Sequence, residues 1–314
     1  MSNRDAYRSF CREIPDLPVF MEPWYLDAAR NGESWDAALV RDGDCTVAAL
    51  PYFTKKQYIF NVITQPVFVK HLGPILHPDR RDLSDQHKYY RQLIEQLPTV
   101  DCFKQHFHPG VSNWLPFYWQ GYRQTLRYTY RLDISDLDQV WSGITGNKRR
   151  EIAKAEKLLQ LRHDLPLEAL YRVNKMSFDR QQIAIPYSLD QLSRLDRALD
   201  EHQSRQLFFA VDDSGNIHSV AFLIWDRQRA YFHLAGDDPA LRKSYGGFWL
   251  IWQCIRYAHL SLGLREFDFA GSMLPEVEPI RRRFGAHQVP YSFVWKYHSG
   301  LYAGLDWMKE RLGI

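Results

Sequence analysis

A loop with two cations and two glycines is the first feature of this sequence that could do chemistry. Arg242 and Lys243 come shortly before Gly246 and Gly247, and an apolar stretch with helical spacing follows. The first N–H groups of a helix lack intrahelical acceptors, and glycine lets a ligand approach the main chain closely. Such a loop can hold a phosphate or a developing oxyanion. The pattern indicates acyl transfer from a phosphate-bearing donor, and a plain loop-to-helix junction is the alternative interpretation.

Four side chains near this loop in the sequence could move a proton during such a transfer. The carboxylate of Asp268 could accept one from an attacking ammonium, directly or through water. Its alternative role is to bind backbone N–H groups in the turn at Gly271. His233 is a suitable base near neutral pH, and Tyr231 or Tyr245 could protonate a leaving thiolate or ribose oxygen. For the histidine and the tyrosines, packing is the competing interpretation.

Two basic segments could bind the phosphates of a larger substrate. Arg281 begins a run of three arginines, which could bind a phosphorylated acceptor or a tRNA backbone. The stretch 148–159 has helical spacing and several Lys and Arg residues, interrupted by Glu151 and Glu156. Mixed charge is typical of a solvated helix face with internal ion pairs. A face that contacts RNA or phospholipid is the alternative.

The elements that must position these residues alternate between strands and helices. Alternating polarity predicts strands, and apolar residues three and four positions apart predict helices. In the second half we expect strands at 207–211, 219–225, 229–235, 265–270 and 288–297. Helices are expected there at 166–179, 188–201, 244–261 and 300–312.

The first half has a similar coarse order of elements. We expect a helix at 22–31, a hairpin of 35–40 and 45–52, a strand at 58–69, a helix at 83–97, and strands at 101–107 and 124–132. This similarity favours a duplicated fold. We therefore predict a mixed α/β protein whose mostly antiparallel sheets are flanked by helices, with domains at 1–130 and 131–314.

The composition is that of a globular protein long enough for two domains. The 314 residues are 45% hydrophobic and 25% charged, so two cores can form without disulfides or metals. The net charge of +3 is too small to argue for nucleic acid binding. The four cysteines form no CxxC motif, and His106 with His108 are too few ligands for a metal.

The sequence also lacks the signals of a membrane-spanning or exported protein. No apolar run approaches the roughly 20 residues of a membrane span, and the N-terminus has no apolar signal core. We expect a cytoplasmic protein with no transmembrane segment, bound metal or DNA partner. A peripheral role at the inner face of the membrane stays open.

Short motifs in a fixed order resemble those of the GNAT N-acyltransferases, and more closely their Fem-like branch. That branch includes peptidoglycan aminoacyltransferases and acetyltransferase-like proteins. The matching residues are Trp24-Tyr25-Leu26, Leu50-Pro51, Leu115-Pro116-Phe117, Gly121-Tyr122, Thr129-Tyr130, Leu132-Asp133, Trp141 with the basic stretch 148–155, Phe267-Asp268-Phe269 with Gly271, and Arg281 to Gly285. The resemblance covers most of the chain and is strongest from about residue 115 to residue 297.

The resemblance implies two GNAT-like domains and the transfer of an acyl or aminoacyl group to an amine. Acyl-CoA or aminoacyl-tRNA would be the donor, with no permanently bound cofactor, and the amine would belong to a cell-envelope precursor or a small molecule. Two departures stand out. Arg281 replaces the family's lysine, and the loop 242–247 lacks the Arg-x-x-Gly-x-Gly spacing of an acetyl-CoA site. The alternative is a degenerate fold that acts only as a binding or scaffold protein.

Overall fold

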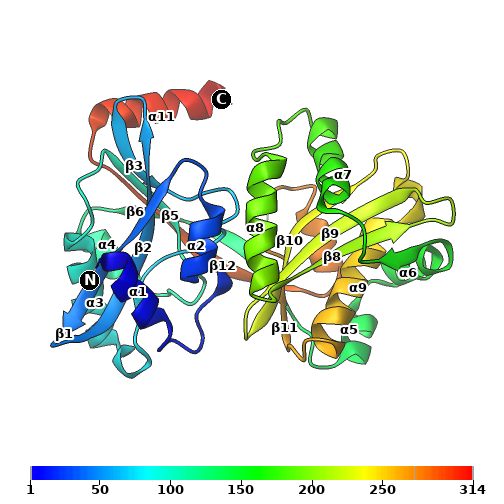
Figure 1. The fold of residues 1–314 in the computed structure, drawn as a ribbon, viewed down its shortest axis with the longest axis horizontal. Helices are drawn as coiled ribbons and strands as arrows, with labels where there is room; N and C mark the ends of the chain where they lie inside the picture. The colour runs from blue at the N-terminus through cyan, green and yellow to red at the C-terminus, as the bar shows by residue number, and fades with distance from the viewer. Residues whose placement is uncertain (1, 272, 313–314) are drawn as a thin grey trace. The chain divides into compact units, whose positions relative to one another are not determined.

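The computed structural model describes residues 2–271 and 273–312, which fold into two compact units (Figure 1). Unit 1 comprises residues 1–127 and 290–314, and unit 2 comprises residues 128–289. The boundary expected after residue 130 is close to the observed one, but residues 290–314 do not stay with the second half. The reason is strand pairing, because the end of β12 (His287–Tyr297) pairs with β5 (Cys102–His106) of unit 1.

Unit 1 is built on a mixed sheet with the strand order β1-β2-β3-β5-β12, and the short β4 pairs with β2. β3 and β5 are parallel, and the other neighbours are antiparallel. The bounds are β1 Ser34–Asp42, β2 Cys45–Gln57, β3 Phe60–Thr64 and β4 Ile75–Leu76. β1 and β2 form the predicted hairpin, whereas the strand predicted at 58–69 is shortened to β3.

The helices of unit 1 are α1 Asn3–Cys11, α2 Pro23–Ala29, α3 Leu83–Glu95, α4 Leu115–Trp119 and α11 Gly300–Leu312, with 3-10 turns at Val19–Met21 and Pro78–Arg80. α1 and α3 contact both β1 and β2. The core of this unit is rich in aromatic side chains, among them Phe103, Phe107 and Phe117. The helices expected at 22–31, 83–97 and 300–312 are present. α1 and α4 are short and were not predicted, because few turns give little periodicity.

Unit 2 is built on a sheet with the strand order β6-β11-β10-β9-β8-β7. Its bounds are β6 Arg123–Asp133, β7 Gln160–Arg162, β8 Arg205–Val211, β9 Ile217–Trp225, β10 Arg229–Asp237 and β11 Glu266–Asp268. Among the described residues of this sheet, β10 and β11 pair in parallel and the other neighbours are antiparallel, so the sheet is mostly antiparallel as expected. β6 begins in unit 1 and ends in unit 2.

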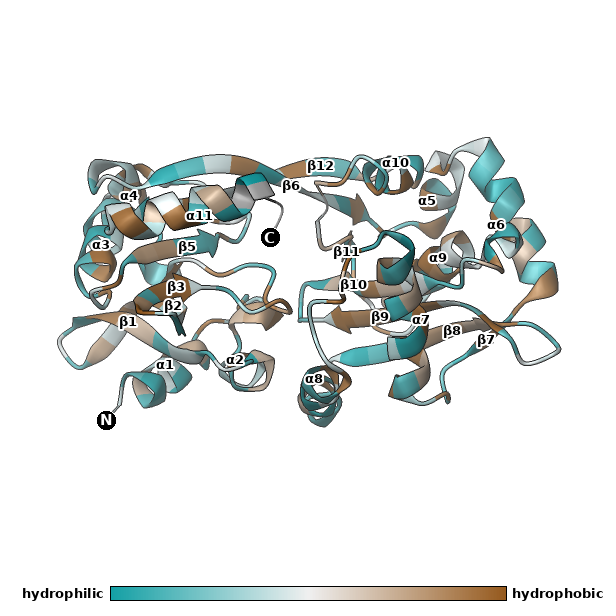
Figure 2. Cartoon of the chain, turned by 90° about the horizontal axis from the view of Figure 1, so that it is seen from above, coloured by the Kyte–Doolittle hydropathy of each residue, from teal (hydrophilic) through white to brown (hydrophobic). Residues whose placement is uncertain are grey.

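The helices of unit 2 are α5 Leu137–Gly143, α6 Gly146–Leu158, α7 Leu167–Arg180, α8 Leu189–Glu201, α9 Gly246–Leu260 and α10 Glu278–Arg283, with a 3-10 turn at Arg242–Ser244. α9 packs on the sheet face that carries Phe208, Leu223 and Phe232, and α7 contacts β10 and β9 from the other face (Figures 1 and 2). α9 is buried along most of its length, whereas α6 is mostly hydrophilic (Figure 2). These two helix layers fix the end of β10.

Candidate functional site

A cavity of about 460 Å³ lies in unit 2, where β10 ends and α9 begins. Of the predicted site residues, it brings together Arg242, Tyr245, Gly246, Gly247 and Arg281. Lys148 and Arg283, from the two basic segments considered above, also line the cavity. It is lined further by polar residues that the sequence analysis did not single out as a site, namely Ser177, Ser219, Asp237 and Glu276. The loop 242–247 therefore borders a cavity rather than a filled loop-to-helix junction.

The two glycines of the loop are needed because protein side chains approach α9 closely. Tyr245 takes the left-handed conformation, with φ of 63°, and α9 starts directly after it. A Cβ atom on Gly246 would lie 2.7 Å from Oγ of Ser219, and one on Gly247 would lie 2.6 Å from Oδ1 of Asp237. Since real Cβ contacts are not this short, neither position accepts a larger residue without movement.

Asp237 is held at the start of α9 by partners on two neighbouring elements. The hydroxyl of Ser219 on β9 donates a hydrogen bond to Oδ1 of Asp237 at 2.7 Å. The backbone N–H of Asp237 donates to Oγ of Ser177 on α7 at 3.1 Å. A carboxylate at this place is favoured by the positive end of the helix dipole. The site therefore presents a fixed anionic group beside Gly247.

α7 determines where the end of β10 lies. A Cβ atom on Gly236 would meet Cα of Asn174 at 2.5 Å and the carbonyl oxygen of Val173 at 2.8 Å, so strand and helix backbones touch at this glycine. The side-chain amide of Asn174 donates to the carbonyl oxygen of Ala235 at 2.6 Å. The hydroxyl of Tyr187 donates in turn to Oδ1 of Asn174. This chain of contacts places Asp237 in the cavity.

Arg281 is the most unusual cation in the cavity. Its side chain is half-buried on α10, and its Nε is buried without a hydrogen-bond partner among the described residues. Its Cζ lies 5.4 Å from the centroid of the Phe269 ring. Burial lowers the pKa of Arg281 to about 10, so the guanidinium is still charged at neutral pH. Arg281 also lines the cavity, where a charged guanidinium is suited to hold an anion.

The other cations differ in how freely they can reach a ligand. Lys148 is buried on α6, pairs with Glu151, and lies 3.9 Å from the centroid of the Phe248 ring. Arg242 and Arg283 are exposed at the edge of the cavity. Four cations thus stand against the carboxylates of Asp237 and Glu276, the two acidic residues that line the cavity. The electrostatics favour a ligand with several negative charges and one positive group.

Asp268 does not line this cavity. Its side chain is 1% exposed, and its Oδ1 accepts hydrogen bonds from the hydroxyl of Thr129 and, at 2.8 Å, from the N–H of Ala270. Nε of Arg131 donates to Oδ2 at 3.0 Å. These contacts tie β11 to β6, and they occupy the carboxylate that the sequence analysis assigned to proton transfer. The geometry supports the alternative role, in which the buried carboxylate of Asp268 binds a backbone N–H of the following turn and links β11 to β6.

Tyr231, His233 and Lys243 also lie outside the cavity lining. The hydroxyl of Tyr231 donates to Oδ2 of Asp226 at 2.7 Å, and burial raises the pKa of Tyr231 far above its usual range. His233 is 5% exposed and sits where the pairing of β10 with β9 shifts register. Lys243 is exposed in the 3-10 turn before α9. Of the nine predicted site residues, five therefore line the cavity and four lie outside its lining.

Asp237 is a candidate site residue that sequence reasoning missed. Its signal was present as an acidic residue directly after Gly236 at the end of a predicted strand, but nothing in the sequence showed that the strand end meets the start of α9. Within the described residues, no cluster of three or more His, Cys, Asp or Glu side chains could hold a metal ion.

The segment 145–276 matches the family model described as Acetyltransferase (GNAT) domain. It begins just before α6 and includes α9, β10 and β11, so it contains most of the cavity. Unit 2 thus carries a GNAT acyltransferase domain, as the motifs predicted. No curated protein sequence matches the chain.

Solved structures with a similar fold extend over both units. FemX aligns with a TM-score of 0.70 at 10% identity, covering 92% of this chain and 95% of that chain. The C-terminal domain of a putative lysylphosphatidylglycerol synthetase from Agrobacterium fabrum aligns with a TM-score of 0.56 at 12% identity, covering 99% and 97%. A tandem GNAT protein from the clavulanic acid biosynthesis pathway aligns with a TM-score of 0.52 at 16% identity, covering 93% and 94%. The predicted Fem-like, tandem GNAT fold is confirmed.

Proposed function

We propose that this protein, a GNAT-fold acyltransferase of the Fem-like branch, transfers an aminoacyl group from tRNA to an amine, with the cavity of unit 2 as the donor site. The observation that carries the proposal is the carboxylate of Asp237, fixed inside a cavity whose other charged groups are mostly cations. An aminoacyl ester has an α-ammonium group that needs an anionic partner. An acetyl group has none. Asp237 supplies that partner beside Gly247.

The cations that line the cavity can bind the phosphate groups of such a donor. The terminal nucleotides of a tRNA carry phosphates next to the ester, and the guanidinium of Arg281, which lines the cavity, can bind one of them. Arg242 and Arg283 at the cavity edge extend this positive surface. The relative from Agrobacterium fabrum is named as a lysylphosphatidylglycerol synthetase domain, which also favours an aminoacyl group over an acetyl group.

The bonds and protons of the proposed reaction balance. The neutral amine attacks the ester carbonyl, the new C–N bond forms, and the C–O bond to the ribose breaks. The nitrogen gives up one proton and the ribose oxygen takes one up. Aligning the two substrates supplies much of the rate. The acceptor amine belongs to a cell-envelope precursor or a small molecule.

Acyl-CoA is the competing donor, because the matched family model is described as an acetyltransferase. Its pyrophosphate would need the start of α9, where the carboxylate of Asp237 already lies beside Gly247. The carboxylate and the pyrophosphate would repel each other there, because both are negatively charged. This arrangement disfavours acyl-CoA as the donor. The scaffold alternative predicts a collapsed groove beside Gly246, whereas a cavity of about 460 Å³ is present there.

The proposal is tested by comparing three forms of one tRNA: lysyl-tRNA, lysyl-tRNA acetylated on its α-amine, and uncharged tRNA. We expect wild-type protein to bind the first form most tightly, with at least roughly a tenfold loss when the α-ammonium is blocked, because a charge-assisted hydrogen bond disappears. In Asp237→Asn this preference for lysyl-tRNA over the acetylated form should vanish. The readout is the dissociation constant from filter binding.

The matched control is Asp238→Asn, which changes the neighbouring acid, a residue that does not line the cavity. It should keep the preference. Equal binding of all three tRNA forms by wild-type protein, together with a thermal shift on adding acetyl-CoA, would assign the cavity to acyl-CoA instead. A saturating ligand at about 100 times its dissociation constant stabilises the fold by roughly 2.7 kcal/mol, so such a shift is measurable.

A further inference from the structure

Unit 1 carries a cluster of exposed apolar side chains at the β2–β3 hairpin tip and on the outer side of α11. Their exposed fractions are 77% for Tyr58, 75% for Ile59, 66% for Leu301, 54% for Trp307 and 46% for Met308. We call this cluster, with the cations beside it, the α11 surface. Clustered exposed side chains of this size mark interaction sites, because single apolar residues are common on surfaces but groups of them are not.

The helix α11 carries apolar side chains on its exposed side as well as on the side that faces the sheet. Tyr302 is 8% exposed and packs against Phe60 of β3, with ring centroids 5.2 Å apart. Asp306 also faces the sheet, where Lys104 and the hydroxyl of Tyr297 bind it. A helix on the surface of a globular protein normally has polar residues on its exposed side. The outward side of α11 is therefore built for an apolar environment.

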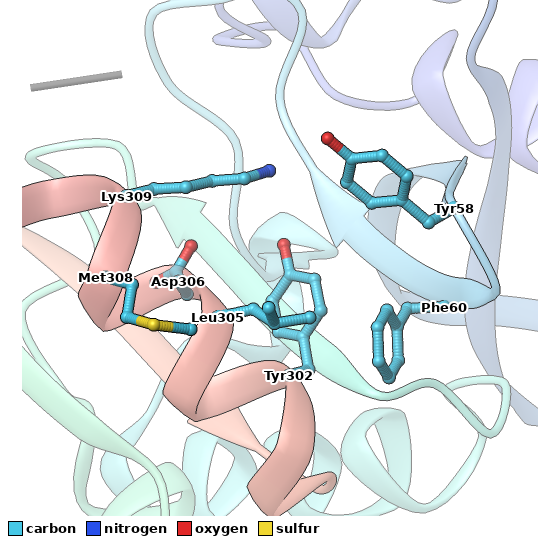
Figure 3. Close-up of a pocket in the computed structure, with 7 residues that line it drawn as sticks. All are labelled: Tyr58, Phe60, Tyr302, Leu305, Asp306, Met308 and Lys309. Carbon is cyan, nitrogen blue, oxygen red and sulfur yellow. The ribbon is translucent and has the colours of Figure 1, made fainter. Parts of the chain in front are cut away.

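A cavity of about 370 Å³ separates the hairpin from α11 and is mostly apolar (Figure 3). Phe60, Leu305 and Met308 contribute to its walls, and Tyr58 stands opposite Lys309. Nζ of Lys309 lies 5.0 Å from the centroid of the Tyr58 ring, and Figure 3 shows the lysine extending toward this tyrosine. The hollow can accept a hydrocarbon segment beside a cationic group.

The charges around these apolar groups are positive. Lys309 lies beside Tyr58, and Arg311 near the end of α11 is exposed. Cζ of Arg311 lies 4.2 Å from the centroid of the Trp307 ring. The acidic side chain that lines the neighbouring cavity, Asp306, is already paired with Lys104. Among the side chains described here, the surface offers apolar and aromatic groups with cations placed directly beside them.

We propose that the α11 surface docks on an anionic phospholipid bilayer. Tyr and Trp are favoured at the boundary between headgroups and acyl chains, where one end of the ring is apolar and the other is wet. Lys and Arg next to exposed apolar groups bind the anionic headgroups, as in helices that lie in the plane of the membrane. Charge complementarity selects the lipid surface over a neutral apolar partner. This inference does not rest on the proposed function, since docking requires no donor.

The test is co-sedimentation of the full chain with vesicles of phosphatidylcholine alone and of phosphatidylcholine with roughly 30% phosphatidylglycerol. We expect binding to the anionic vesicles and at least about tenfold weaker binding to the neutral ones. Lys309→Glu combined with Arg311→Glu should reduce anionic binding by at least about tenfold, since each cation near such a surface is worth a factor of about five. Ile59→Asp combined with Met308→Asp should abolish it.

A control variant makes the same kinds of change on unit 2. Arg180→Glu combined with Ile183→Asp replaces an exposed cation and an apolar residue that is 53% exposed, and it should bind like wild type. Failure of wild-type protein to bind anionic vesicles would overturn the proposal, as would binding that the α11-surface variants leave unchanged. Concentration-dependent dimerisation that Ile59→Asp with Met308→Asp removes would also overturn it, by assigning the surface to a second copy of the chain.

Discussion

Two aspartates that end neighbouring parallel strands have very different surroundings. Asp237 ends β10 in a cavity, with Ser219 and the start of α9 beside it. Asp268 ends β11, where its oxygens are taken up by Thr129, Arg131 and a backbone N–H. A carboxylate can bind a substrate ammonium only where lone pairs face a solvent-filled space. At the scale of single residues, the accessibility of the carboxylate lone pairs thus distinguishes Asp237, which could bind a ligand, from Asp268, which holds the structure together.

Replacing Asp268 should therefore damage stability and leave donor recognition intact. In Asp268→Asn, the new amide would face Nε of Arg131, donor against donor, and a buried charge would lose its main partner. We expect a loss of about 3 kcal/mol in the free energy of unfolding, as for other broken buried pairs. For a chain of this size the melting temperature should fall by roughly 5 °C.

The check combines thermal unfolding with the binding of lysyl-tRNA at a temperature where the variant is folded. Asp133→Asn serves as the control, because Asp133 lies on the same strand as Arg131 but is exposed. That change should cost less than about 1 kcal/mol. If Asp268→Asn melted like wild type and lost its preference for lysyl-tRNA, Asp268 would be a ligand group after all.

At the scale of elements, the site depends on how closely α7 packs on β10. Gly236 lets the helix backbone approach the strand, and the next residue is Asp237. The side chain of Asn174 then holds the carbonyl group of Ala235 in place. A small residue at this crossing therefore controls the position of a charged group in the cavity.

Gly236→Ala should consequently reduce both stability and donor recognition. Its Cβ would lie 2.5 Å from Cα of Asn174, and since this neighbour is backbone, the whole helix must move. Overpacking of this kind costs about 2 kcal/mol. Urea unfolding should show the loss, and the preference for lysyl-tRNA should weaken. Gly143→Ala, where a Cβ meets nothing within 4 Å, should leave both quantities unchanged.

The sequence was sufficient for the elements that position the site but not for their contacts. Periodicity predicted the helix that begins at Gly246 and the strand that ends near Gly236. It could not show that Asp237 meets Gly247 or that Asp268 meets Arg131, because these contacts join segments far apart in the chain. For the same reason the pairing of β12 with β5 was not foreseen. The local sequence pattern predicts secondary structure. Only the folded chain shows which polar groups are already bound by other residues and which are accessible to a ligand.

At the scale of the whole molecule, the chain does not complete one unit before it begins the other. Unit 1 takes its first strands from residues before 128 and its last strand and helix from residues after 289. Phe293 and Trp295 of β12 pair with His106 and Lys104 of β5. Unit 2 is continuous from 128 to 289.

A chain shortened to end at Val289 should therefore lose the fold of unit 1 and keep that of unit 2. β5 would lack its β12 neighbour, and the core around Phe103 would lose Val294. We expect limited proteolysis to leave a resistant fragment spanning about residues 128–289. A chain that ends at Ser299 retains β12 and lacks only α11, so it should protect both units. Resistance of residues 1–127 in the shorter chain would contradict this expectation.

The discontinuous path of unit 1 also has a consequence for synthesis on the ribosome. Residues 128–289 can fold as soon as they emerge, although they come second in the chain. The first 127 residues must wait for β12, and at typical rates of translation the delay is roughly 10 to 30 seconds. During that time β5 is an open strand edge, which other nascent chains can pair with. Newly made protein should therefore depend on chaperones for its N-terminal half.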